Sequence, residues 1–234
     1  MTRHLQVQTM GYAYFISPKA LASASVPTWA YDHAGLEQRQ LIEGQASGRA
    51  QAWFFTLDAT AMVLRHYRRG GLPAYLSADR YLWQGLSRSR PWRELNVLCE
   101  LTTRGLPVPT PLGGRIKRQG LSYRADIVTE RIKTARPLAE CIAQGFDDWH
   151  AIGKTIAQFH AAGAGHADLN VRNVLIDAGG KVWLIDWDRG FLGAGSRQQQ
   201  QSLQRLRRSL SREPRLETAA KQHWSALMAG YVEP

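Results

Sequence analysis

The sequence predicts an α+β protein whose first half is rich in strands and whose second half is mainly helical. Short runs of β-branched and aromatic residues dominate the first half of the chain. Helical periodicity dominates the second half, which also contains one short β-hairpin at residues 174–185. At 234 residues the chain fits one large domain or two small lobes.

Composition and charge limit the possible functions. The 234 residues, 44% of them apolar, are enough to bury a real core. The net charge of +11 is unusual and indicates a polyanionic partner, such as a nucleotide, a nucleic acid or an anionic lipid surface. Cys99 and Cys141 are far apart in the sequence, so we expect no disulfide framework and a reducing cytosol. We also expect no transmembrane helix and no signal peptide, because a long apolar stretch is missing.

Four strands are predicted in the first half from apolar runs bounded by turn-forming residues. They are residues 12–16, 53–55, 61–67 and 123–129. Residues 106–111 contain three prolines, so we expect them to lead into an edge strand rather than a central one. A helix is predicted to begin at Pro91 and to end at Gly105 as its C-cap. Its apolar positions recur at helical spacing: Leu95, Leu98 and Leu101.

Helices are also predicted at residues 137–145 and 147–162, the second with Asp147 as its N-cap. The inner stripe of this second helix is Ile152, Ile156 and Phe159. The tail, residues 196–234, is basic and helical, and Pro214 is expected to break it.

The first helix of this tail has an apolar face and a basic face. The apolar residues are Leu203, Leu206 and Leu210, and the basic residues are Arg205, Arg208 and Arg212, with Arg207 beside them. A basic amphipathic helix suits a membrane surface with anionic head groups. An ordinary packed helix with a solvated arginine face explains the same pattern equally well.

The most informative stretch is residues 166–188, HADLNVRNVLIDAGGKVWLIDWD. It predicts a polar loop followed by a β-hairpin, which would bring Asp168, Asn173 and Asp186 together. Carboxylate and amide oxygens, with phosphate oxygens, are the ligands that Mg²⁺ prefers. A carboxylate can also accept the proton of an attacking hydroxyl group. The stretch therefore suits phosphoryl transfer from ATP.

Residues 43–50, EGQASGRA, contain Gly44 and Gly48 before a predicted strand. Glycines allow a backbone to approach phosphate groups closely. A glycine-bearing hairpin turn is an equally good interpretation of this segment alone.

The pattern His-x-Asp-x-x-x-x-Asn, followed by a strand that ends in Asp, resembles the protein-kinase-like superfamily. That resemblance implies that Asp168 is the base, that Asn173 and Asp186 hold Mg²⁺, and that ATP is the donor. The usual Asp-Phe-Gly is replaced by Asp-Trp-Asp at residues 186–188, so a flipping switch at this point is not expected. His166 is expected to shape the loop.

The same resemblance implies a fold of two lobes, a strand-rich first lobe over residues 1–133 and a helical second lobe over residues 134–234. It also assigns roles in the first lobe. Arg65 matches the strand lysine that holds the ATP phosphates, and Glu94 is the candidate for its carboxylate partner, with Glu100 as the fallback. The alternative for Arg65 is a solvated side chain on an edge strand. Gly44 and Gly48 would belong to the loop that covers the phosphates, although the segment does not match Gly-x-Gly-x-x-Gly.

A longer pattern resembles the lipopolysaccharide kinases, and within them the enzymes that act on 3-deoxy-D-manno-octulosonic acid (Kdo). The segments that carry it are residues 64–71, 105–111, 166–176, 181–190 and 206–210. The resemblance implies ATP-dependent phosphorylation of the 4-hydroxyl of Kdo on a lipid A precursor. It also implies a peripheral location on the cytoplasmic face of the inner membrane. The charge of +11 agrees, since such a glycolipid is anionic.

Three alternatives remain at this stage. An aminoglycoside or choline-type kinase has a similar loop, but a cationic acceptor calls for an acidic pocket, and the second half of this chain is rich in arginine. A non-catalytic nucleotide or lipid sensor would have no need of Asp168, Asn173 and Asp186 together. A nucleic-acid binder is suggested by charge alone, and no nucleic-acid motif supports it, so we expect no nucleic-acid partner.

Overall fold

The computed structural model describes residues 4–21, 26–46, 52–68 and 79–233. The chain forms two compact units: Met1–Glu100 with Thr110–Arg131, and Leu101–Pro109 with Ile132–Pro234. The first is built around an antiparallel sheet and the second around helices, which confirms the predicted α+β class. The functional division into lobes at residues 1–133 and 134–234 stays a prediction.

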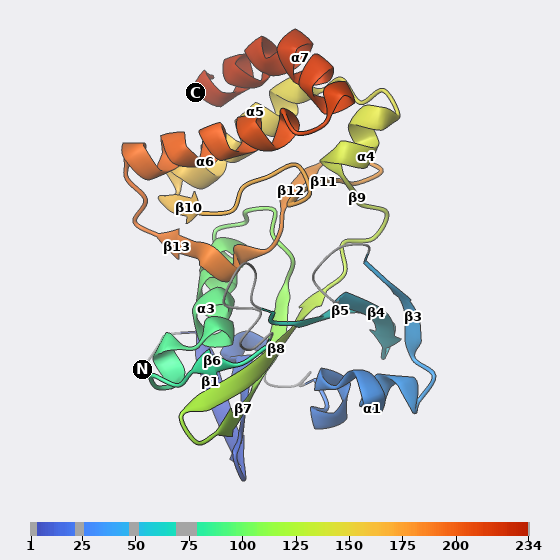
Figure 1. Cartoon of the computed structure of the whole chain (residues 1–234), viewed down its shortest axis with the longest axis vertical. Helices are drawn as coiled ribbons and strands as arrows, with labels where there is room; N and C mark the ends of the chain where they lie inside the picture. The colour runs from blue at the N-terminus through green and yellow to red at the C-terminus, as the bar shows by residue number, and fades with distance from the viewer. Residues whose placement is uncertain (1–3, 22–25, 47–51, 69–78, 234) are drawn as a thin grey trace. The chain divides into compact units, whose positions relative to one another are not determined.

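An eight-stranded antiparallel sheet makes up most of the first unit (Figure 1). Its strands are β1 Leu5–Met10, β2 Ala13–Pro18, β3 Ile42–Gln45, β4 Ala52–Leu57, β5 Thr60–His66, β6 Tyr81–Leu82, β7 Pro111–Gln119 and β8 Ser122–Glu130. The strand order is β1-β2-β7-β8-β5-β4-β3, and β6 pairs with β8. All four strands predicted in this half are present, each overlapping β2, β4, β5 or β8.

The prediction of an edge strand after residues 106–111 is wrong. β7 lies between β2 and β8, in the interior of the sheet. The prolines do not prevent this, because Pro107 and Pro109 precede the strand and Pro111 is its first residue. No interior hydrogen-bond donor of the strand is therefore lost.

The helical segments described beside the sheet include α3 Arg90–Thr103, the 3-10 helix η2 Thr28–Tyr31 and α1 His33–Glu37. The apolar cluster that joins η2 and α1 to the sheet includes Tyr31, Leu36, Phe55 and Leu64. α3 ends as predicted. Gly105 has a φ of +72°, and the backbone N–H of Leu106 donates to the carbonyl oxygen of Leu101 at 3.0 Å.

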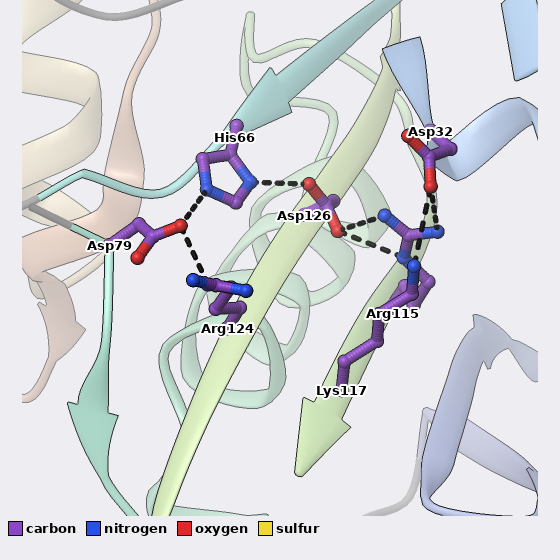
Figure 2. A network of polar contacts seen from close by, with 7 residues as sticks. All are labelled: Asp32, His66, Asp79, Arg115, Lys117, Arg124 and Asp126. Atoms are coloured by element: carbon purple, nitrogen blue, oxygen red, sulfur yellow. Dashed lines mark hydrogen bonds and ion pairs between the residues drawn. The ribbon is translucent and has the colours of Figure 1, made fainter. Parts of the chain in front are cut away.

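A row of charged side chains crosses three neighbouring strands of this unit (Figure 2). The register places His66 on β5 opposite Asp126 on β8, and Asp126 opposite Arg115 on β7. His66 Nδ1 lies 2.7 Å from Asp126 Oδ1, and Arg115 Nη2 lies 2.8 Å from Asp126 Oδ2. Asp79 approaches the other ring nitrogen of His66 at 3.4 Å, and Asp32 approaches Arg115 at 3.4 Å. The two carboxylates beside His66 hold its ring in place.

The described part of the second unit contains four complete α-helices and five short strands. They are α4 Leu138–Ala143, α5 Trp149–Ala161, α6 Ser196–Leu210, α7 Pro214–Val232, β9 Arg136–Pro137, β10 Ala164–His166, β11 Val174–Ile176, β12 Val182–Leu184 and β13 Gly190–Leu192. β10 pairs with β13, and β11 pairs with both β12 and β9. The helical tail is broken at Pro214, as predicted, because α7 starts at that proline.

Helices α5 and α7 lie side by side (Figure 1), and glycines set their close approach. A Cβ atom on Gly153 would lie 1.9 Å from the carbonyl oxygen of Leu227, and one on Gly230 would lie 2.2 Å from that of His150. The predicted inner stripe of α5 is buried. The predicted N-cap is wrong by one residue, since Asp148 rather than Asp147 accepts the hydrogen bond from the N–H of Ala151, at 3.0 Å.

Candidate active site

The loop from His166 to Asn173 is fixed at both ends. At its start, β10 pairs with β13, so that His166 lies opposite Gly190. At its end, β11 pairs with β12 in the predicted hairpin, which the structure confirms. The backbone N–H of Ile185 donates to the carbonyl oxygen of Asn173 at 3.0 Å. The hairpin therefore places Asn173 beside the segment that follows β12 and contains Asp186.

His166 links the loop to that segment. The ring is 3% exposed; its Nδ1 accepts a hydrogen bond from the backbone N–H of Asp168 at 3.2 Å. Its Nε2 contacts the carbonyl oxygen of Ile185 at 2.9 Å. These partners select the neutral tautomer with the proton on Nε2. Burial lowers the pKa of His166, and the carboxylates of Asp186 and Asp168 act in the opposite direction. Both candidate carboxylates thus lie near one imidazole, as a shared site requires.

Asp168 combines a fixed backbone with an accessible carboxylate. Its carbonyl oxygen accepts hydrogen bonds from Nδ2 of Asn170 and Nδ2 of Asn173, both at 2.9 Å. Its side chain is 51% exposed. A carboxylate presented in this way can accept a proton from a substrate hydroxyl group. Asn170 was not predicted, although Asn is a common organiser of tight turns.

Asn173 and Asp186 have the chemistry of cation ligands. The amide nitrogen of Asn173 is engaged with Asp168, which leaves the amide oxygen as the end that can meet a cation. Asp186 adopts a left-handed conformation with φ of +62°, which Asp tolerates better than most residues. Within the described ranges, no group of three or more His, Cys, Asp or Glu side chains could hold a metal. The pair fits Mg²⁺ that arrives with a nucleotide, since Mg²⁺ is commonly held by one or two carboxylates plus substrate phosphates.

Trp187 packs beneath the loop. It is 1% exposed, its ring stacks on Phe159 with centroids 5.2 Å apart, and its centroid lies 4.7 Å from that of His166. Its indole N–H donates to the carbonyl oxygen of Leu184 at 3.0 Å. A buried, hydrogen-bonded indole suits the expectation that this position does not flip.

Helix α6 supports the loop from a second direction. Ser202 Oγ donates to the carbonyl oxygen of His166 at 3.1 Å, and Ser209 Oγ accepts from the backbone N–H of Val171 at 3.0 Å. Both serines are buried. Their contacts were not predicted, although their spacing of seven residues places them on one side of a helix.

In the first unit, Arg65 and Glu94 form the predicted pair. Arg65 Nη2 lies 2.5 and 2.6 Å from the two carboxylate oxygens of Glu94, which also accepts from the Tyr67 hydroxyl group at 2.6 Å. Glu94 is 2% exposed. The edge-strand alternative for Arg65 is wrong, because β5 lies between β8 and β4. The fallback, Glu100, instead lies 3.0 Å from His4 Nε2.

The glycine-bearing segment is only partly described. Gly44 lies in β3, next to an irregularity in its pairing with β4. A Cβ atom there would meet only Phe54, at 3.7 Å, so packing does not require a glycine. Gly48 lies outside the described residues. A role for Gly44 and Gly48 in covering phosphates stays a prediction.

A family model described as "Lipopolysaccharide kinase (Kdo/WaaP) family" matches residues 34–231. This range contains every residue proposed for the site. The chain belongs to the lipopolysaccharide kinase (Kdo/WaaP) family. Membership makes it a kinase, a transferase of phosphoryl groups, with ATP as the substrate that its family implies.

Curated members of the lipopolysaccharide kinase family are similar over most of their length. A 3-deoxy-D-manno-octulosonic acid kinase of Xanthomonas axonopodis pv. citri (strain 306) is 48% identical over 168 residues, 70% of this chain and 68% of that protein. One of Stenotrophomonas maltophilia (strain K279a) is 42% identical over 201 residues, 85% of this chain and 80% of that protein. One of Xanthomonas campestris pv. campestris (strain B100) is 43% identical over 204 residues, 86% of this chain and 81% of that protein. In the described part of the chain, no helix is long and apolar enough to cross a membrane.

Proposed function

We propose that this chain transfers the γ-phosphoryl group of ATP to the 4-hydroxyl of Kdo on a lipid A precursor, in lipopolysaccharide core biosynthesis. The observation that carries the proposal is the 42–48% identity to proteins named 3-deoxy-D-manno-octulosonic acid kinase. The arrangement of the loop supports it, because an accessible carboxylate and two possible cation ligands are held around His166.

Asp168 acts as the base in this proposal. Its carboxylate accepts the proton of the acceptor hydroxyl group, whose oxygen attacks the γ-phosphorus as the bond to the β,γ-bridging oxygen breaks and ADP leaves. Asn170 and Asn173 hold the Asp168 backbone, and His166 holds its N–H. This support keeps the base in one position. Such positioning of the reacting groups supplies much of the rate of phosphoryl transfer.

The proposal also assigns roles in binding the donor. Arg65, oriented by Glu94, binds phosphate oxygens as a planar fork, which a lysine could not do. Gly44 and Gly48 belong to the loop that covers the phosphates. Asn173 and Asp186 would hold Mg²⁺, which when bound neutralises charge that develops on the phosphate oxygens.

The second candidate is an aminoglycoside or choline-type kinase. A net charge of +11 disfavours it, because cationic acceptors call for acidic surroundings. The test is ATP turnover by purified protein with three acceptors: Kdo-bearing lipid A precursor, an aminoglycoside and choline. Turnover that depends on the Kdo lipid supports the proposal, and turnover that depends on either of the others rejects it.

We also propose that the protein binds the anionic cytoplasmic surface of the inner membrane as a peripheral protein. The apolar face of α6 is buried: Leu203 is 8% exposed, and Leu206 and Leu210 are 0% exposed. That face is therefore not available for insertion among lipid chains. Arg208 on α6 and Arg212 just beyond its end are exposed, so attraction between charges is the mode of binding that this segment can offer.

A further inference from the structure

Arg205 lies next to the candidate base. Its Nη1 atom is 4.0 Å from Oδ1 of Asp168, and the two side chains are 48% and 51% exposed. An ion pair this exposed contributes little to the free energy of folding. Stability therefore gives no strong reason for an arginine at this position.

The placement of Arg205 is set by the helix that carries it. Ser202 and Ser209, on either side of it in α6, are buried and bonded to the backbone of His166 and Val171. Positions 202, 205 and 209 recur at helical spacing, so they follow one side of α6. α6 thus runs alongside the catalytic loop, and Arg205 is held level with Asp168.

A molecule bound to the guanidinium group would lie within reach of the base. Arginine binds carboxylates as a planar fork with two parallel hydrogen bonds. The relatives are named for an acid, and Kdo has its carboxylate on C1, whereas the proposed acceptor hydroxyl is on C4. Three carbon–carbon bonds of about 1.5 Å each join those atoms. The carboxylate and hydroxyl of one sugar therefore suit a cation and a base 4.0 Å apart.

We propose that Arg205 binds the carboxylate of the acceptor sugar and so presents its hydroxyl group to Asp168. This assignment rests on the proposed function, and it names Arg205 as the residue that determines specificity for the acceptor. An acceptor with the same ring but without the negative charge loses this contact, whereas binding of the donor nucleotide is unaffected. Arg205 thus governs the KM for the acceptor and not the KM for ATP.

The test compares two acceptors in detergent micelles: Kdo-bearing lipid A precursor and the same lipid with the Kdo carboxylate converted to its methyl ester. The variants are Arg205→Gln and Arg205→Lys. Arg197→Gln is the matched control, because Arg197 is an exposed arginine in the first turn of the same helix, about two turns from Arg205. Kinetics with varied acceptor and with varied ATP are measured for each protein.

We expect the wild type and Arg197→Gln to prefer the acid to the ester by roughly 10-fold or more in kcat/KM. Arg205→Gln should raise the KM for the acid by a similar factor, leave the KM for ATP unchanged and abolish the preference. Arg205→Lys should restore part of it, since the charge remains while the fork is lost.

The contrary outcomes separate this assignment from the proposed function. Equal use of acid and ester by the wild type, or an unchanged preference in Arg205→Gln, overturns the role of Arg205 and leaves the kinase proposal standing. An increase in the KM for ATP alone would assign Arg205 to the donor and also overturn it. A wild-type protein that phosphorylates neither lipid overturns both proposals.

Discussion

The backbone N–H of Asp168 donates a hydrogen bond to Nδ1 of His166 at 3.2 Å. The same ring contacts the carbonyl oxygen of Ile185 through Nε2, so one buried imidazole joins the base to the segment that contains Asp186. His166 can serve in this way only while it is neutral, because a proton on Nδ1 would face the N–H of Asp168.

Replacing His166 tests this link. His166→Ala should lower kcat by about 10-fold or more, because the loop loses its fixed geometry, with a smaller change in the KM for ATP. It should also lower the free energy of unfolding by about 1–3 kcal/mol for each buried backbone group left without a partner. Steady-state kinetics and denaturant unfolding measure the two effects. An unchanged kcat in a folded variant would exclude the positioning role.

The Arg65–Glu94 pair predicts a defect in donor binding. Glu94→Gln weakens the hold on Arg65, so the KM for ATP should rise by roughly 10-fold while the KM for the acceptor stays the same. Arg65→Lys keeps the charge but loses the fork, and should raise the KM for ATP by less than Arg65→Ala does. Initial rates at varied ATP measure both. A defect confined to the acceptor would contradict the assignment.

His66 predicts a dependence of stability on pH in the first unit (Figure 2). The hydrogen bond with Asp126 raises the pKa of His66 above its usual value, and Asp79 adds to this. A raised pKa in the folded state means that the stabilisation is fully present below the unfolded pKa of about 6.5. It is lost as the pH rises through the folded pKa.

We therefore expect the midpoint of thermal unfolding to fall between about pH 6 and pH 8 in the wild type. His66→Gln should be less stable than the wild type at pH 6, and this difference should shrink at pH 8. Differential scanning calorimetry at constant ionic strength measures it. A difference that grows with pH would show that the protonated ring is not the stabilising form.

Electrostatic membrane binding predicts a strong effect of salt. The protein should sediment with vesicles that contain anionic phospholipids, but not with phosphatidylcholine vesicles, and about 0.5 M NaCl should release it. Replacing both Arg208 and Arg212 with Gln should weaken binding by roughly 30-fold, at about 1 kcal/mol for each cation near the surface. The matched control replaces Lys154 and Lys221 with Gln. Binding that resists salt would indicate an apolar anchor instead.

Local sequence patterns predicted several secondary-structure elements and residue pairs of this protein. The hairpin at residues 174–185 and the pairing of Arg65 with Glu94 follow from strand patterns and from the resemblance to kinases. The prolines before β7 were misleading, because the order of strands in a sheet depends on contacts distant in sequence. The contacts of Ser202 and Arg205 with the loop could not be predicted for the same reason, since α6 meets the loop only in the folded unit.

The most direct test is to incubate the purified protein with ATP, Mg²⁺ and Kdo-bearing lipid A precursor and to locate the new phosphate by NMR. We predict a phosphate on the 4-hydroxyl of Kdo with the wild type. Asp168→Ala should give a rate lower by roughly 10²- to 10⁴-fold. A lipid that stays unmodified, a phosphate at another position, or near-normal turnover by Asp168→Ala would contradict the account.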